Sequence, residues 1–263
     1  MSDGHVVREN IGNVSVIRIN RPERKNAMTE DMLQAFVNYL TEIDEDESVG
    51  AFIVTGTGDS FISGLDVGKV TARVSTMDPE SWRRFRDLTS SQFSIIQRSA
   101  KPSVAAINGA CVAGGFPVAL ACDVRVASSS AIFKMGYRRV GLMPSMNMCF
   151  VLPHMIGLGR AKLLALTDRT ISAAEAEALG LVEKVAEPDE MLRTAIDLAQ
   201  EMASGPPIWI AVTKEAMNQA YGLNLDQLRR QVDYMQFMLG RTEDHAEAIA
   251  AFTEKREPHF KGR

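Results

Sequence analysis

Apolar residues follow two periods along the chain, and the pattern predicts strands and helices in alternation. Continuous apolar runs at Gly50 to Thr55 and at Ser103 to Ile107 are typical of parallel strands that are buried on both faces. Apolar positions three and four apart between Met32 and Ile43 indicate a helix, which Thr29 is placed to cap. Strands that alternate with helices favour an α/β fold with a largely parallel sheet.

Helical spacing dominates the last part of the chain. Gly205-Pro206-Pro207 is the clearest boundary, and helical pattern continues beyond it almost to the end. The segments there are rich in methionine and aromatic residues, which is typical of a core or of an oligomer interface. We therefore predict a core of residues 1–204 and a C-terminal helical region of residues 205–263. The segment from Ile132 to Ser145 is rich in turn formers and predicts irregular structure.

One stretch carries the strongest local signal, from Asn108 to Asp123. It passes from a predicted strand through Gly114 and Gly115 into an apolar helix, and Pro117 suits the first turn of that helix. Paired glycines allow close approach to the backbone, and the free N–H groups at a helix start favour negative charge. The stretch predicts an apolar slot with backbone donors at its end; the alternative is a strand–turn–helix joint without function.

Composition narrows the classes of protein. The chain has 263 residues, 46% of them hydrophobic, and a formal net charge of -4, with no basic stripe of the kind that binds nucleic acid. The cysteines at 111, 122 and 149 lack metal-ligand spacing, so they are expected to be reduced thiols, and no metal site is predicted. Without a signal peptide or an apolar run of membrane-spanning length, we expect a cytoplasmic protein that binds neither nucleic acid nor membrane.

Seven stretches, taken in order, resemble the crotonase (enoyl-CoA hydratase/isomerase) superfamily. They are Asn20 to Met28, Phe61 to Val67, Lys101 to Gly109, Gly114 to Asp123, Gly157 to Ala161, Ala173 to Val182 and Thr242 to Asp244. Each motif is weak alone, but the ordered set is specific and spans nearly the whole chain. The resemblance implies a crotonase-like spiral of ββα turns with a C-terminal helical trimerisation module, assembled as a homotrimer or a dimer of trimers.

The resemblance also implies an acyl-CoA thioester as the substrate, with coenzyme A as part of it and no separate cofactor. Two backbone N–H groups, which map onto Leu65 and Gly114, would form an oxyanion hole for the thioester carbonyl. Such donors stabilise the negative charge that develops on this oxygen when the acyl chain becomes an enolate.

For coenzyme A, the resemblance points to residues beside the Arg-Pro motif and the first oxyanion motif, and to a C-terminal lysine that would reach the coenzyme A of a neighbouring subunit. The residues that it assigns are Arg24, Lys25, Ala27, Ser63, Asp66, Lys69 and Lys261. Lysine and arginine suit phosphates. The alternative for Arg24, Lys69 and Lys261 is a solvated surface charge, and for Asp66 a structural role.

The chain departs from the family pattern where typical hydratases carry two glutamates that activate water. Pro117 stands three residues after the oxyanion glycine, and Tyr137 stands four residues after Phe133. Ser145 follows a Gly-x-x-Pro turn, where related branches place a carboxylate. Tyr137 and Ser145 are therefore the candidate catalytic side chains, the alternatives being a pocket-lining aromatic and a turn residue.

Three functions remain in competition. The first is an acyl-CoA enzyme of the hydratase/isomerase type that works through a stabilised thioester enolate. The second is decarboxylation, carbon–carbon bond hydrolysis or another isomerisation on the same fold, which the missing glutamates make at least as plausible chemically. The third is an acyl-CoA-binding protein without turnover.

Overall fold

The computed structural model describes residues 4–68, 73 and 76–263, without the side chains of residues 146 and 147. The larger of two sheets has six strands. Its order is β1 (Val6–Ile11), β2 (Val14–Ile19), β3 (Ala51–Gly56), β5 (Ser103–Ile107), β7 (Val124–Ser128) and β10 (Lys184–Ala186). The first pair is antiparallel, and every later pair is parallel. The predicted apolar runs are therefore the central strands of a largely parallel sheet.

A second sheet has four short strands. Its order is β4 (Ser60–Ile62), β6 (Ala110–Val112), β8 (Ile132–Lys134) and β9 (Ile171–Ser172). The first three strands run parallel, and β9 is antiparallel to β8. The expectation of irregular structure from Ile132 to Ser145 was wrong at its start, where β8 lies. With three residues, of which only Phe133 is buried, β8 leaves almost no pattern in the sequence.

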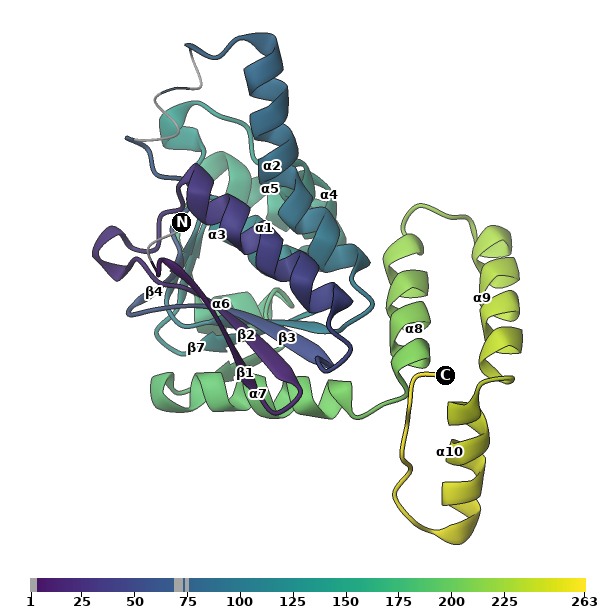
Figure 1. The fold of residues 1–263 in the computed structure, drawn as a ribbon. Helices are drawn as coiled ribbons and strands as arrows, with labels where there is room; N and C mark the ends of the chain where they lie inside the picture. Colours follow the sequence, from purple (N-terminus) through teal and green to yellow (C-terminus); the bar gives the residue numbers. More distant parts are fainter. Residues whose placement is uncertain (1–3, 69–72, 74–75) are drawn as a thin grey trace.

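Helices cover both faces of the larger sheet (Figure 1). The helices of this part are α1 (Glu30–Glu45), α2 (Pro79–Arg98), α3 (Gly115–Ala121), α4 (Met146–Ile156), α5 (Leu158–Thr167), α6 (Ala173–Ala178) and α7 (Pro188–Ala203). Thr29 caps α1 as predicted, by accepting a hydrogen bond from the Met32 N–H. Side chains of β3 alternate between two cores: Phe52 and Val54 pack under α1, and Ile53 packs against α7.

Three C-terminal helices stand beside this body in Figure 1: α8 (Pro207–Gln219), α9 (Leu225–Leu239) and α10 (Glu243–Glu254). A buried lysine of α8 ties them to it, because Lys214 Nζ donates to the carbonyls of Ile96 and Lys101 and pairs with Asp123, each at 2.9 Å. The division into residues 1–204 and 205–263 stays a prediction.

The apolar residues of these helices are largely exposed. Leu225 is 81% exposed and Phe252 is 86% exposed, so they do not belong to a core of this chain. An oligomer interface, the other role predicted for this composition, stays a prediction. In the part of the chain that the structure describes, no helix is long and apolar enough to cross a membrane.

Candidate active site

The candidate residues follow the carboxyl ends of the three parallel strands in the smaller sheet. Leu65 comes three residues after β4, Gly114 two residues after β6, and Tyr137 three residues after β8. Because parallel neighbours end at the same edge, the pairing of β4 with β6 and of β6 with β8 brings these residues to one place. This edge is where ligands bind in open α/β sheets.

Hydrogen bonds between Met28 and the two residues that flank Leu65 fix the orientation of the Leu65 amide. Leu65 forms a parallel bridge with Met28, in which the Met28 N–H donates to the Gly64 carbonyl (2.8 Å) and the Asp66 N–H donates to the Met28 carbonyl (2.9 Å). The N–H of Leu65 itself therefore points to the opposite side of the strand. No acceptor for it is found among the described residues, and the same holds for the Gly114 N–H.

Ala113 lies at the centre of this edge and adopts a left-handed conformation with φ of +47°. A Cβ built on Gly64 would lie 2.9 Å from the Ala113 Cβ and 3.2 Å from the Gly114 nitrogen, and one built on Gly136 would lie 3.3 Å from the Ala113 Cβ. The three chain segments are thus in direct backbone contact around Ala113. A non-glycine residue at positive φ is uncommon and strained, and such residues cluster at functional sites and turns; Lys25, Asn26, Asp168 and Lys255 of this chain share the conformation.

The adjacent glycines Gly114 and Gly115 have different steric roles. A Cβ on Gly114 would lie 3.2 Å from the Gly64 Cα and 3.8 Å from the Leu65 nitrogen, which is tight but close to an ordinary contact. A Cβ on Gly115 would lie 2.1 Å from the Ile62 carbonyl oxygen, which is impossible without movement. The position that strictly requires glycine for space is therefore Gly115, and Gly114 lies where the two backbone amides meet.

Pro117 lies in the first turn of α3, as predicted, and is buried. Its ring has no ionisable group, so at this position acid or base chemistry is excluded. Because α3 has only seven residues, its dipole is small, and stabilisation of an anion depends on the individual N–H groups.

Tyr137 and Ser145 lie close together, although their sequence separation is eight residues. Burial raises the pKa of the Tyr137 phenol to about 12, and the side chain and backbone of Ser145 and the charge of Arg86 lower it only in part. Ser145 caps α4 without a side-chain cap bond, and its Oγ is buried with no partner of hydrogen-bond geometry among the described residues. At neutral pH the phenol is protonated, so it can donate a proton but is a poor base.

The residues assigned to coenzyme A by the Arg-Pro motif lie on one exposed loop. Arg24 ends a short 3₁₀ turn (Pro22–Arg24) and is exposed. Lys25 forms an ion pair with Asp59, which lowers the pKa of that carboxyl. The carbonyl of Ala27 accepts a hydrogen bond from Arg21 at 2.9 Å. Of these three, Arg24 is the cation for which no ion pair is found among the described residues.

The remaining assigned residues are more scattered. Ser63 is half-buried just after β4. Asp66 pairs with Arg21 at 2.8 Å, which agrees with the structural role. Lys69 lies outside the described residues. Lys261 is exposed on the C-terminal tail, where its backbone N–H donates to Asp244 at 2.6 Å.

Three buried polar residues that support the site were missed by sequence reasoning. Asn26 is fully buried and ties the Arg-Pro loop to Thr57 and Ser60 through its side-chain amide. Asp168 accepts a hydrogen bond from the Gly136 N–H at 2.6 Å and so holds the backbone before Tyr137. Arg21 is buried and pairs with Asp66. Arg21 and Asn26 lie inside the Arg-Pro motif and Asp168 lies between motifs, but the partners Asp66, Thr57 and Gly136 are distant in sequence, so no local pattern marks these contacts.

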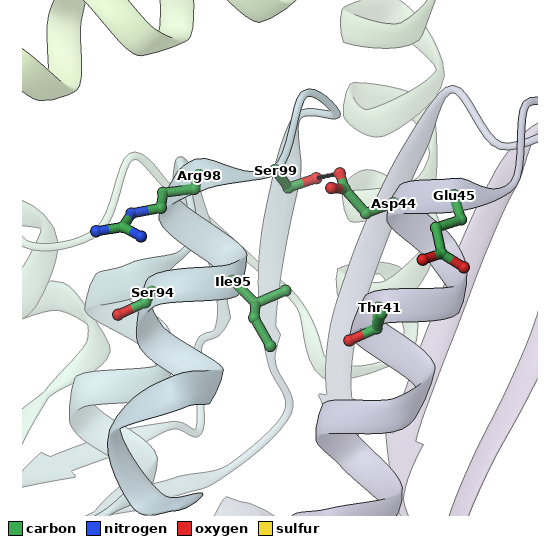
Figure 2. A pocket seen from close by; sticks show the side chains of 7 residues that line it. All are labelled: Thr41, Asp44, Glu45, Ser94, Ile95, Arg98 and Ser99. Atoms are coloured by element: carbon green, nitrogen blue, oxygen red, sulfur yellow. Dashed lines mark hydrogen bonds between the residues drawn. The ribbon is translucent and has the colours of Figure 1, made fainter. Parts of the chain in front are cut away.

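A surface hollow lies elsewhere, between the C-terminal ends of α1 and α2 (Figure 2). It is lined by Thr41, Asp44, Glu45, Ser94, Ile95, Arg98 and Ser99. Both helices lead from there into the amino ends of strands of the larger sheet, so the hollow is at the edge opposite to that of a typical α/β ligand site. It is not the candidate active site.

The remaining reactive groups do not form a second site. Cys111 and Cys122 are buried, and burial raises both thiol pKa values, that of Cys122 to about 12. These two cysteines are poor nucleophiles for that reason. Cys149 is a free, exposed thiol. In the described part of the chain, no three His, Cys, Asp or Glu side chains are grouped to hold a metal ion.

Known proteins resemble this chain over nearly its whole length. Residues 9–263 match the sequence profile of the enoyl-CoA hydratase/isomerase family. A short-chain-enoyl-CoA hydratase of Clostridium acetobutylicum is 34% identical over 257 residues, covering 97% of each chain. A 1,2-epoxyphenylacetyl-CoA isomerase of Escherichia coli is 30% identical over 251 residues, covering 95% of each chain. The crystal structure of an enoyl-CoA hydratase from Bacillus anthracis matches with a TM-score of 0.92 at 31% identity, covering 98% of this chain and 100% of that one.

Proposed function

Because the chain belongs to the enoyl-CoA hydratase/isomerase family and has its crotonase fold, we propose that the amides of Leu65 and Gly114 polarise the carbonyl of a bound acyl-CoA thioester. The observation that carries the proposal is the contact between these two backbone segments at the carboxyl edge of the smaller sheet. Two fixed donors there stabilise an enolate oxygen without reorganisation during the reaction.

Tyr137 is the side chain that we assign to proton transfer. Its pKa of about 12 keeps the phenol protonated, so its proton is available to the α-carbon of an enolate. The resemblance places Pro117 and Tyr137 where hydratases have glutamates, which disfavours water addition by a carboxylate pair. Decarboxylation fits this set: the bond between the α-carbon and the substrate carboxylate breaks, carbon dioxide leaves, and the electron pair of the bond forms the enolate. Tyr137 then donates its proton to the α-carbon and regains one from water. Ser145 Oγ lies beside the phenol and would orient the acyl group.

The handle for coenzyme A is proposed along the exposed loop and tail. Arg24, Lys25, Ala27, Ser63 and Lys69 would contact the nucleotide and the pantetheine arm, and Lys261 would reach the coenzyme A of a neighbouring protomer. The exposed apolar residues of α8 to α10, Phe252 among them, support assembly as a homotrimer or a dimer of trimers. The assembly is testable by light scattering.

The test is a panel of acyl-CoA esters, namely crotonyl, 3-enoyl, malonyl-type and β-ketoacyl, assayed for both binding and turnover. We expect turnover of at least one member. Gly114→Pro deletes the N–H, and its ring suits the native φ of -61°. Relative to Gly114→Ala, which keeps the N–H, Gly114→Pro should lose about 100-fold or more in kcat.

The outcomes separate the competing functions. Turnover of the malonyl-type ester alone would establish decarboxylation. Rapid hydration of crotonyl-CoA would contradict the role given to Tyr137. Binding of every ester without turnover would identify an acyl-CoA-binding protein. Equal kcat for Gly114→Pro and Gly114→Ala would refute the assignment of the Gly114 amide.

A further inference from the structure

Arg21 is a buried cation that the proposed coenzyme A contacts do not use. Its side chain is only 9% exposed. One nitrogen, Nη1, donates both to the Ala27 carbonyl (2.9 Å) and to Asp66 Oδ2 (2.8 Å). Its backbone is fixed as well, because the Arg21 N–H donates to Asn26 Oδ1 at 2.9 Å. A side chain held in this way is unsuited to a phosphate in solution and points to a role inside the fold.

The two acceptors of this guanidinium flank the residue pair that holds the oxyanion amide. Ala27 directly precedes Met28, and Asp66 directly follows Leu65. Met28 and Leu65 form the bridge whose hydrogen bonds turn the Leu65 N–H outward. Arg21 thus cross-links the two strands of the bridge from the side. This cross-link supplements the two backbone hydrogen bonds of the short bridge.

The charge of Arg21 matters in addition to its geometry. Asp66 directly follows Leu65, and its side chain is only 15% exposed. A largely buried carboxylate in the residue next to an oxyanion donor opposes negative charge on the enolate oxygen, to a degree set by their separation. The ion pair at 2.8 Å offsets the negative charge of Asp66.

We propose that Arg21 is a positioning residue for the oxyanion hole: it fixes the Leu65 peptide through Ala27 and Asp66 and screens the Asp66 carboxylate. The inference rests on the proposed function, because it assumes that the Leu65 N–H binds the thioester carbonyl. It assigns the arginine of the Arg-Pro motif to catalysis through Leu65, separate from the coenzyme A contacts of the same loop.

The experiment measures how strongly the site polarises a carbonyl. Crotonyl-CoA labelled with ¹³C at its carbonyl is bound to each variant, and difference infrared spectroscopy gives the C=O stretching frequency. In the wild type this frequency should fall below its value in water. In Arg21→Met the C=O stretching frequency should return toward its value in water. For the ester of the panel that the wild type turns over, kcat should drop by about tenfold, with KM changed less than about twofold.

Two further variants separate geometry from charge. Arg21→Lys keeps the charge, but an ammonium lacks the planar fork that fixes the guanidinium, so its kcat should lie between those of the wild type and Arg21→Met. The double variant Arg21→Met, Asp66→Asn removes the negative charge that Arg21 offsets and should recover part of kcat. Failure of both to recover would overturn the charge-screening part of the proposal.

A matched control separates positioning from stability. Arg125 is also a buried arginine, 5% exposed, with bonds to Leu181, Cys122 and Glu183. Arg125→Met should lose comparable stability to urea and leave the carbonyl frequency unchanged. If Arg21→Met also leaves the lowered wild-type frequency unchanged, the inference is wrong. If the wild type itself does not lower the frequency, the oxyanion assignment fails instead.

Discussion

Alanine at Gly115 should destabilise the fold far more than alanine at Gly114, although the two glycines are adjacent. At Gly115 the new Cβ would lie 2.1 Å from the Ile62 carbonyl oxygen and 2.9 Å from the Ile62 Cβ. Ordinary van der Waals contact begins near 3.4 Å, so the end of β4 would have to move by about 1.3 Å. At Gly114 the nearest atom is already 3.2 Å away, and about 0.2 Å of movement suffices.

The magnitudes follow from these distances. Forcing an atom into a packed backbone costs about 3 kcal/mol or more, whereas the preference of a helix for alanine over glycine returns only about 1 kcal/mol. Gly115→Ala should therefore lose about 2 kcal/mol or more of unfolding free energy. Gly114→Ala should lose less than about 1 kcal/mol, but the atom that it displaces is the Gly64 Cα, next to Leu65. Small displacement of a catalytic donor lowers kcat, here by about tenfold.

Urea unfolding followed by circular dichroism measures the first quantity, and steady-state turnover measures the second. The two substitutions should separate cleanly: lost stability at Gly115, lost kcat with retained stability at Gly114. A Gly115→Ala protein that unfolds at the wild-type urea concentration would refute the packing argument. A Gly114→Ala protein with wild-type kcat would refute the placement of the two amides.

Three further results are expected. Tyr137→Phe should lower kcat at every pH, and the wild-type profile should show no loss of the proton donor below about pH 11, because the phenol pKa is raised to about 12. Since tyrosine in the unfolded chain ionises near pH 10, the free energy of unfolding of the wild type should also fall between about pH 10 and pH 12. Tyr137→Phe should abolish this pH dependence. A loss of activity centred near pH 10 would contradict both the raised pKa and the stability change that follows from it. Lys214→Met should cost about 3 kcal/mol in urea unfolding, because Asp123 loses a buried partner; an unchanged midpoint would show that the tie to α8 adds no stability. Arg256 lowers the pKa of Glu247 to about 2, so the hydrogen bond from the His259 N–H to the Glu247 carboxylate should persist below about pH 4.3 and disappear as the pH falls through 2. Amide exchange of His259 that is already fast at about pH 3.5 would refute this.

Much of the fold was predictable from local pattern. The strand at Ser103 to Ile107 has the predicted bounds, and the helix behind Thr29 contains all the apolar positions predicted from Met32 to Ile43 and ends at Glu45. The strand buries a continuous apolar run, and the helix buries one face and begins after a capping side chain. Neighbouring residues alone therefore specify both elements. The strand β8 escaped prediction because three residues with one buried side chain are too short to show a period.

The residues of the candidate site were predicted from the sequence, but their arrangement in space was not. Leu65, Gly114, Tyr137 and Ser145 were assigned from motifs of a known superfamily, and that resemblance placed Pro117 and Tyr137 where hydratases carry glutamates. Whether their chain segments meet depended on the pairing of β4, β6 and β8, which no local pattern encodes. The tertiary structure also showed that space requires glycine at 115 rather than at 114.

What the sequence by itself determined are the elements, the family and the residue types available for chemistry, because these depend on local pattern and ordered motifs. Only the tertiary structure decided which groups act together. Arg21 and Asp66 are 45 residues apart and meet because the chain forms a bridge at Met28 and Leu65. Burial, and the raised pKa of Tyr137 that follows from it, are likewise set by segments distant in sequence. Contacts of this kind exist only once the sheets have formed.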